Sequence, residues 1–251
     1  MNIQLIRHAT LLITVNGRNI LVDPMLGEVG SMPPIPKTAN QVPNPTVQLP
    51  ESFDLQQLQQ LDAVLITHTH ADHFDEAAVQ LLPKGLPVFC QREDVQKLQE
   101  AGFTDVRPVA ESVVWENITM HRTNGQHGTG EIGKLMGIVS GFVLQTDEEP
   151  SLYIAGDTIW CSDVEEALDA YRPDITVLFA GGAQFLQGGP ITMTKEDVEK
   201  VCLHAPYTRV LPVHLEAINH CGLTREELRG YLAGKGLESQ VVILQDGETA
   251  L

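Results

Sequence analysis

Short apolar runs alternate with longer amphipathic stretches along the whole chain. Runs of about four to eight residues, rich in Val, Ile and Leu and bounded by turn residues, are typical of strands. On this basis we expect strands at residues 3–6, 11–15, 19–22, 61–66, 87–90, 113–115, 118–121, 138–145, 152–155, 175–179, 209–213 and 241–244. Asn16-Gly17, between the second and third of these, predicts a hairpin turn.

Apolar residues at helical spacing follow several of these runs. They predict helices at residues 74–82, 92–101, 163–171, 195–203 and 225–232. Thr194 and Asp197 have the spacing of a capping pair at the start of the fourth helix. Strands mixed with helices, without a low-complexity linker, predict one domain of the α/β class over residues 1–251. Its simplest form is two β-sheets packed together with helices on both outer faces.

One long segment has neither pattern. Residues 29–50 carry few apolar anchors and six prolines, at positions 33, 34, 36, 43, 45 and 50. They therefore predict a long loop. Two interpretations stay open at this point, a solvated connection and a lid or wall of a substrate site.

A cluster of ligand-type side chains follows the apolar run at 61–66. Residues 67–73 read Thr-His-Thr-His-Ala-Asp-His. In an extended segment His68 and His70 project to the same side and can hold one cation. Asp72 and His73 lie in the turn before the next helix, where they can face a second cation. Imidazole and carboxylate without thiolate suit zinc, with manganese and iron as alternatives. The simpler alternative is a histidine-rich turn with capping or hydrogen-bonding roles.

The remaining ligands can come from three further positions, each at the end of a strand-like run or in a glycine-rich turn. These are His127 in Asn-Gly-Gln-His-Gly, Asp157 in Ala-Gly-Asp-Thr and His214 in Leu-Pro-Val-His. Loops at one edge of a sheet bring distant parts of a chain together. Taken singly, a solvated histidine, a turn-forming aspartate and a buried hydrogen-bonded histidine would explain them, but their order after the first cluster favours a shared metal site.

With these residues the sequence resembles the metallo-β-lactamase fold superfamily of metal-dependent hydrolases, whose pattern is H-x-H-x-D-H followed by a histidine, an aspartate and a last histidine. The resemblance covers nearly the whole chain and implies a four-layer αβ/βα sandwich. It also implies that His68, His70 and His127 hold one metal, that Asp72, His73 and His214 hold a second, and that Asp157 bridges them. His8-Ala9-Thr10 with residues 20–24 is similar to the branch containing ascorbate-6-phosphate lactonase-like hydrolases.

The expected activity follows from such a pair of cations, which together lower the pKa of a shared water and polarise an electrophile. We expect a hydrolase of a small lactone, ester or phosphoester that uses a metal-bridging hydroxide, with Asp72 holding a metal and orienting the hydroxide. No Gly-x-Ser-x-Gly motif favours a serine hydrolase instead. A nuclease of the same fold and a non-catalytic metal-binding carrier are the alternatives.

Several neighbours of these residues have open roles. Asp23 is either a carboxylate that orients a ligand histidine or the end of a strand in an Asp-Pro turn. For His8 a structural role is favoured, and for Cys221 that of a small buried hydrophobe. His220 and Glu216 are candidates for protonating the leaving atom, although ordinary hydrogen bonding is favoured for both. Residues 179–185, with two glycines, are expected as a plain turn or as a wall of the cleft.

The composition of the chain restricts the classes of partner that we expect. Asp and Glu number 33 against 16 Lys and Arg, for a formal net charge of -17. Such a surface repels polyanions, and the chain has no dense basic patch. We expect a small-molecule substrate, no nucleic acid and no membrane, and the sequence leaves a homo-oligomer open. The absence of a leader-like or membrane-spanning run, with four cysteines at unpaired spacing, predicts a cytoplasmic location.

Overall fold

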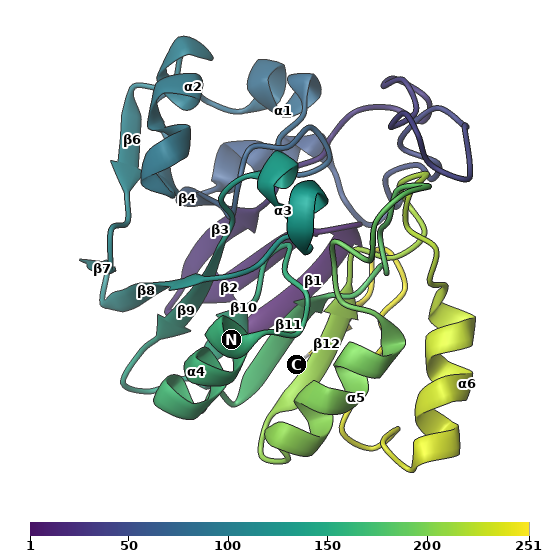
Figure 1. The fold of residues 1–251 in the computed structure, drawn as a ribbon. Coiled ribbons are helices and arrows are strands. Elements are labelled where there is room, and N and C mark those ends of the chain that lie inside the picture. The colour runs from purple at the N-terminus through teal and green to yellow at the C-terminus, as the bar shows by residue number, and fades with distance from the viewer. Residues whose placement is uncertain (251) are drawn as a thin grey trace.

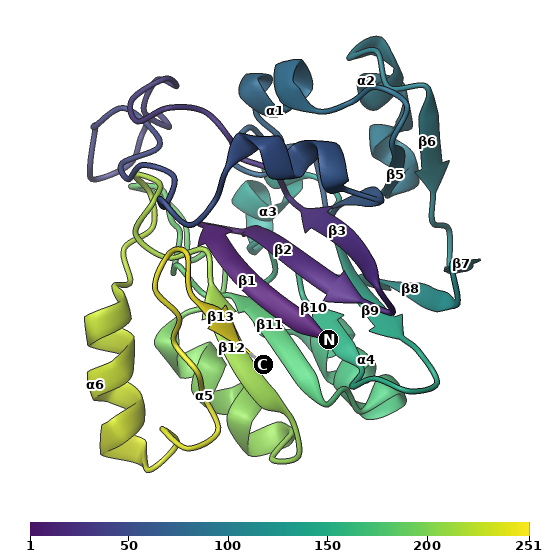
Figure 2. The same ribbon diagram turned by 180° about the vertical axis from the view of Figure 1, so that it is seen from behind.

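The computed structural model describes residues 1–250 and arranges them in two β-sheets with helices on both outer sides (Figure 1; Figure 2). The first sheet has the order β13-β1-β2-β3-β4-β5-β6, and the second β12-β11-β10-β9-β8-β7. The strands are β1 (Asn2–Arg7), β2 (Thr10–Val15), β3 (Arg18–Val22), β4 (Ala63–Ile66), β5 (Pro87–Cys90), β6 (Asp105–Pro108), β7 (Ser112–Trp115), β8 (Ile118–Asn124), β9 (Ser140–Gln145), β10 (Leu152–Ile154), β11 (Ile175–Phe179), β12 (Arg209–Val213) and β13 (Thr249–Ala250). The helices are η1 (Leu55–Gln60), α1 (Glu76–Leu81), η2 (Arg92–Asp94), α2 (Val95–Glu100), α3 (Gly130–Met136), α4 (Ser162–Tyr171), α5 (Lys195–His204) and α6 (Arg225–Lys235).

Both sheets are mixed. In the first, β1, β2 and β3 form an antiparallel meander and β3 to β6 run parallel. The predicted hairpin turn is confirmed, since Val15 pairs with Arg18 and both Asn16 and Gly17 have positive φ. In the second sheet, β10, β11 and β12 are parallel, while β7, β8 and β9 are antiparallel.

The alternation of side chains along the strands builds the layers. Ala63 and Leu65 of β4 point into the core shared by the two sheets, while Val64 and Ile66 point to the outer core beneath η1, α1 and α2. The second sheet behaves in the same way, with Leu178 of β11 facing the core under α4, α5 and α6. Strands covered on both faces read as continuous apolar runs. The predicted α/β fold with two mixed sheets and outer helices is confirmed.

Most predicted elements are found with small shifts of their ends. The capping pair is confirmed, because Thr194 accepts from the Asp197 amide and Asp197 accepts from the Thr194 amide. The helix expected at 92–101 is divided into η2 and α2. The strand expected at 241–244 is wrong. Only Val241 makes an isolated bridge to Val210; Val241 and Leu244 are buried in the cores beside the sheets, and Val242 and Ile243 pack against them.

Four elements were not anticipated: η1, α3, β6 and β13. β13 is only two residues long, which is too short for a periodic signal. α3 contains no buried residue, so it lacks the two-sided contrast by which an amphipathic helix is recognised.

In the described part of the chain, no helix combines the length and the apolar character needed to cross a bilayer. The cytoplasmic location and the single domain over residues 1–251 stay predictions.

Candidate metal centre

All the candidate ligands follow strands that end at the same edge of the two sheets (Figure 1). β1, β3 and β4 run in one direction in the first sheet, and β8, β10 and β12 run in one direction in the second. Their carboxyl ends therefore meet. The loops after them carry His8, Asp23, residues 68–73, His127, Asp157 and His214.

The backbone at this edge is unusual. His8, Asp23 and His214 have φ of 60°, 43° and 63°, a left-handed conformation that is uncommon for non-glycine residues and is frequent at functional sites. Gly156, just before Asp157, has φ of 71°, and a Cβ there would lie 2.4 Å from the carbonyl oxygen of Ser140. The turn that presents Asp157 therefore requires glycine.

A first group of donors consists of His68, His70 and His127. The Nε2 atom of His68 lies 3.0 Å from the Nδ1 atom of His70. One ligand nitrogen from each of the three rings lies within 4.8 Å of the other two. Donors on one tetrahedral zinc, with bonds of about 2.0 Å, are about 3.3 Å apart, so this spacing suits a shared cation.

A second group consists of Asp72, His73 and His214, joined by His8. The Oδ2 atom of Asp72 lies 3.4 Å from His8 Nε2, 3.6 Å from His214 Nε2 and 3.8 Å from His73 Nε2. The ring of His8 lies 3.7 Å from that of His214, centroid to centroid. The sequence favours a structural role for His8, but these contacts also make it part of the cluster.

Asp157 lies between the two groups. Its Oδ2 atom is 3.4 Å from His127 Nε2 and 3.2 Å from His73 Nε2, and its Oδ1 atom is 3.4 Å from His214 Nε2. One carboxylate thus faces donors of both groups, as a bridging ligand must.

Partners behind the rings hold several histidines in place. His73 Nδ1 lies 2.9 Å from the Oδ2 atom of Asp23, and His127 Nδ1 lies 2.7 Å from the carbonyl oxygen of Ile191. When Nδ1 is engaged in this way, Nε2 is left for a cation. Asp23 thus ends the strand and also orients a candidate ligand, so both interpretations of it hold.

Cys221 has the equivalent position behind His214. Its Sγ atom lies 3.5 Å from His214 Nδ1. Burial would raise the pKa of the Cys221 thiol, but His214 and His220 lower it to about 7. Cys221 packs against the small apolar cluster of Met25, Ala217 and Ile218, as the sequence favours, but its thiol also contacts a candidate ligand. Gly181 packs against the same histidine, since a Cβ there would lie 2.2 Å from the carbonyl oxygen of His214.

Burial and the attraction between the aspartates and the histidines together set the pKa values of the cluster. Burial alone would raise the pKa of Asp157, yet His214 and His73 hold it well below its usual range. Burial would lower the pKa of His73, but Asp157 and Asp72 raise it to about 10. For His68 burial dominates and the pKa falls. The two carboxylates thus attract positive charge to the second group, whether it is carried by protons or by a cation.

The residues present fit divalent cations. Buried polar atoms normally have hydrogen-bond partners. Among the described residues, several buried atoms of this cluster have none: His8 Nδ1 and Nε2, His73 Nε2, His214 Nε2 and Asp157 Oδ1. Converging imidazole nitrogens and carboxylate oxygens are the donor set of zinc sites and of related metals.

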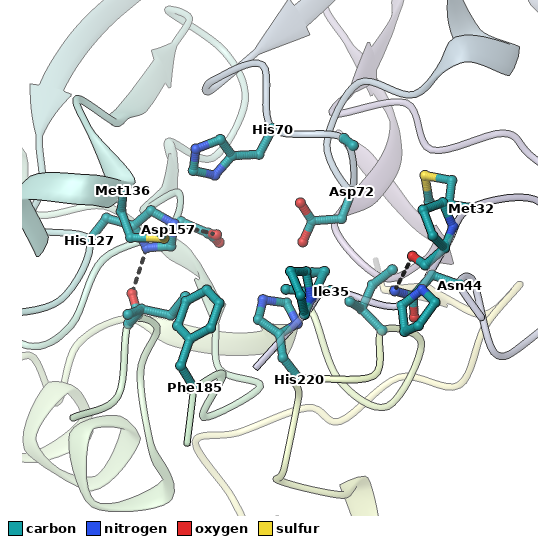
Figure 3. Close-up of a pocket in the computed structure, with 16 residues that line it drawn as sticks. Met32, Ile35, Asn44, His70, Asp72, His127, Met136, Asp157, Phe185 and His220 are labelled. Atoms are coloured by element: carbon teal, nitrogen blue, oxygen red, sulfur yellow. Dashed lines mark hydrogen bonds and ion pairs between the residues drawn. The ribbon is translucent and has the colours of Figure 1, made fainter. Parts of the chain in front are cut away.

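The cluster opens into a cavity of about 380 Å³ (Figure 3). Its lining side chains outside the cluster are mostly apolar: Met32, Pro33, Pro34, Ile35, Pro36, Met136, Phe185, Ile191 and Ile218, with Asn44 and His220 as polar exceptions. Figure 3 shows Met136 and Phe185 on the His127 side, with Met32 and Asn44 opposite. The Pro-rich segment at 29–50 therefore forms one wall of this cavity, and residues 179–185 contribute another through Phe185.

The two candidates for proton transfer have different positions. Glu216 accepts from the backbone amide of Arg225 at 2.7 Å and pairs with its guanidinium, so it has the ordinary role that the sequence favoured. His220 lines the cavity. Burial alone would lower the pKa of His220, but its neighbour Cys221 raises it.

Comparison with known proteins gives concordant matches. The family model described as the beta-lactamase superfamily domain matches residues 18–215. The UPF0173 protein YddR of Bacillus subtilis is 40% identical over 252 residues, which cover 99% of both chains.

Solved structures match over the full length. An isothiocyanate hydrolase from Delia radicum gut bacteria is 36% identical with a TM-score of 0.95, covering 100% of this chain and 99% of that one. A protein of Veillonella parvula described as a possible metal-dependent hydrolase is 34% identical with a TM-score of 0.96, covering 100% and 98%. Both relatives share the complete architecture that carries the cluster.

Proposed function

The chain belongs to the β-lactamase superfamily and is a metal-dependent hydrolase, and we propose that it cleaves a small, uncharged, largely apolar electrophile at a dinuclear zinc centre. An isothiocyanate is the first substrate to test. The narrower assignment to the ascorbate-6-phosphate lactonase-like branch stays a prediction.

Two cations would be held by the two groups of donors. His68, His70 and His127 would hold the first, and Asp72, His73 and His214 the second. Asp157 would bridge them, which its contacts with both groups support. When bound, such a pair supplies hydroxide near neutral pH and polarises the electrophile. Manganese and iron are the alternatives to zinc on donor chemistry alone.

The lining of the cavity is the observation that carries the substrate class. No Lys or Arg of residues 1–250 is among its lining residues. Lys and Arg side chains commonly bind phosphate groups, and here only the metal ions would offset the charge of a phosphoester, so a neutral substrate suits this lining better. The apolar walls would bind a hydrocarbon group and exclude water from the reacting centre. The same lining and the net charge of -17 disfavour the nuclease.

The hydrolysis of an isothiocyanate suits the side chains that line this cavity. Addition of water to R–N=C=S forms a C–O bond at the central carbon and breaks the C–N bond, which yields the amine R–NH₂ and carbonyl sulfide. The departing nitrogen needs a proton. His220 is the one titratable lining residue of the described chain outside the seven proposed ligands, so it is our candidate donor.

The test is a hydrolysis panel on zinc-loaded protein with benzyl isothiocyanate, a neutral lactone and bis(4-nitrophenyl) phosphate. We expect kcat/KM for the isothiocyanate to exceed that for the phosphodiester by about tenfold or more, because the cavity offers the phosphate no cationic side chain. Benzylamine release is followed by chromatography. Turnover of the phosphodiester alone would contradict the proposal.

A ligand variant and a matched surface variant complete the test. Asp157→Asn should lower kcat/KM by more than about 100-fold, since even partners behind metal ligands are worth roughly 10–100-fold. His204→Ala, which removes a histidine paired with Asp169 at the surface, should have no effect. Full zinc occupancy without turnover of any substrate would instead favour the carrier.

A further inference from the structure

A second, larger groove of about 860 Å³ lies beside the metal-side cavity. α3 and the loop at 185–189 form its two sides. They are in contact, since a Cβ at Gly188 would lie 3.3 Å from the Cγ2 atom of Ile132. The backbone amide of Leu186 donates to the carbonyl oxygen of Lys37 at 2.8 Å, which ties this loop to the Pro-rich wall.

The inner surface of this groove is apolar and exposed. Its apolar lining residues are Pro36, Ile132, Leu135, Met136, Phe185 and Leu186. Leu135 is 76% exposed and Leu186 is 69% exposed, and both line this one groove. A single exposed leucine elsewhere on a protein surface is ordinary. α3 has no fully buried residue and contributes none to the hydrophobic cores, so its apolar side chains are left available at the surface. Neighbouring exposed apolar side chains in a concave surface are typical of binding sites.

Polar side chains stay at the rim. Lys37, Glu131 and Gln187 also line the groove, and all three are exposed. Glu131 is paired with Lys134 at 2.6 Å on the same helix. A charged ligand would therefore find no buried partner here.

The groove is continuous with the metal-side cavity. Pro36, Met136 and Phe185 line both. In Figure 3 Met136 and Phe185 lie on the His127 side of the cavity, so the groove that they also line adjoins the cavity on that side. The cavity of about 380 Å³ has room for a reactive group with a short substituent, and a longer one must leave it.

We propose that this groove, which we call the side groove, binds the apolar tail of the substrate, an alkyl or arylalkyl chain whose electrophilic end lies at the metal centre. The inference rests on the proposed function for the identity of that electrophile. It extends the substrate class from a small apolar molecule to one with a tail that continues beyond the cavity.

A test that does not depend on turnover uses n-alkyl hydroxamates, whose two oxygens chelate a divalent cation, on the zinc-loaded full-length chain. From acetohydroxamate to octanohydroxamate, affinity should rise by about two- to fourfold per methylene once the chain enters the side groove. Calorimetry gives each dissociation constant. Equal affinities along the series, or no binding of octanohydroxamate, would overturn the proposal.

Exposed leucines allow variants with little risk to folding. Leu135→Gln and Leu186→Gln should each lower the affinity for octanohydroxamate by about threefold or more and leave that for acetohydroxamate unchanged. Leu203→Gln is the matched control, because Leu203 is 64% exposed on α5 and lines neither space. If Leu203→Gln had the same effect as the other two, the side groove would not be the binding site.

The same variants separate this inference from the proposed function. If no isothiocyanate is hydrolysed but the hydroxamate series and the variants behave as expected, the side groove stands and the substrate assignment fails. If alkyl isothiocyanates are hydrolysed without any dependence on chain length or on Leu135 and Leu186, the side groove fails alone. A dimer in sedimentation that Leu135→Gln dissociates would show that a second copy covers the groove and would also overturn the inference.

Discussion

Asp23 illustrates how one buried side chain can fix several features of the centre. Its Oδ1 atom accepts from the Thr67 amide at 2.8 Å, and its Oδ2 atom accepts from the Thr67 hydroxyl at 2.7 Å and lies 2.9 Å from His73 Nδ1. It thus joins the end of β3 to the end of β4 and sets the direction in which His73 presents Nε2.

We therefore expect Asp23→Asn to weaken zinc binding. The amide cannot supply the same charge and acceptor set to His73, and loss of such a partner typically costs about 10–100-fold in metal affinity. Competition with a chromophoric chelator measures it. Asp62→Asn, which alters a carboxylate paired with Arg18 away from the cluster, serves as the control. Equal affinity of the Asp23 variant and wild type would contradict the role.

His8 supports a second prediction at this scale. Its Nε2 atom is the nearest side-chain nitrogen to Asp72 Oδ2 among the contacts of the second group. We expect His8→Ala and the bulkier His8→Gln each to lower the affinity for the second cation by about tenfold or more and to spare the first. Zinc titration resolves the two steps. His121→Ala, on β8, is the control, and unchanged second-step affinity in both His8 variants would assign His8 a structural role only.

At the scale of elements, one buried residue from the other half of the chain makes several of the bonds that hold the Pro-rich wall. The Asn219 side-chain oxygen accepts from the Ile35 amide at 3.0 Å and from the Asn44 side chain at 2.8 Å, and its nitrogen donates to the Thr38 hydroxyl at 2.7 Å. A segment without regular structure of its own is thereby fixed against the loop that follows His214.

Asn219→Ala should loosen this wall. Several buried polar groups would lose their partner at about 1–3 kcal/mol each, a cost that local opening of the loop avoids. We expect faster amide hydrogen exchange across residues 31–47 and a higher KM, with the free energy of unfolding lowered by only about 1–2 kcal/mol. Asn40→Ala, at an exposed position of the same loop, should change none of these. Unchanged exchange in Asn219→Ala would refute the anchoring role.

At the scale of the whole molecule, the two sheets contribute different parts of one centre. The first sheet carries His8, Asp23 and residues 68–73, and the second carries His127, Asp157 and His214. A bound pair of cations would therefore join the two sheets at the edge where their loops meet, and ligands that bind only the folded state stabilise it.

This arrangement predicts a pH-dependent stabilisation by zinc. Burial alone would lower the pKa values of His73 and His214, but the carboxylates of Asp157 and Asp72 outweigh this effect. The pKa of His73 is raised to about 10, and the pKa of His214 is also raised. Both shifts favour the protonated rings in the metal-free protein, and a ring nitrogen must lose its proton to bind a cation. Binding should release about two protons and strengthen as pH rises.

Scanning calorimetry with and without zinc checks the sign, and the increase in Tm should be larger at pH 8 than at pH 6. Titrations in buffers of different ionisation enthalpy count the released protons. Asp157→Asn, which lacks the bridging carboxylate, should show a smaller increase at both pH values. An increase in Tm that is the same at pH 6 and pH 8 would contradict the predicted proton release.

The sequence by itself determined most of the strands, most helices and the seven candidate donors. Strands that are covered on both faces have continuous apolar sequences, which can be recognised directly. Each donor follows such a run or lies in a glycine-rich turn. His68 and His70 are two positions apart on extended backbone, so their common direction is a local property. These features need no knowledge of which strands pair.

Only the tertiary structure decided what surrounds those donors. His8, Cys221 and His220 look like ordinary buried residues along the chain, and they join the centre because β1 and the loop after β12 end beside the same edge. The cavity and the side groove combine residues 32–36, α3 and residues 184–191, which are far apart in sequence. Because apolar side chains in loops follow no period, their meeting point depends on the packing of the two sheets.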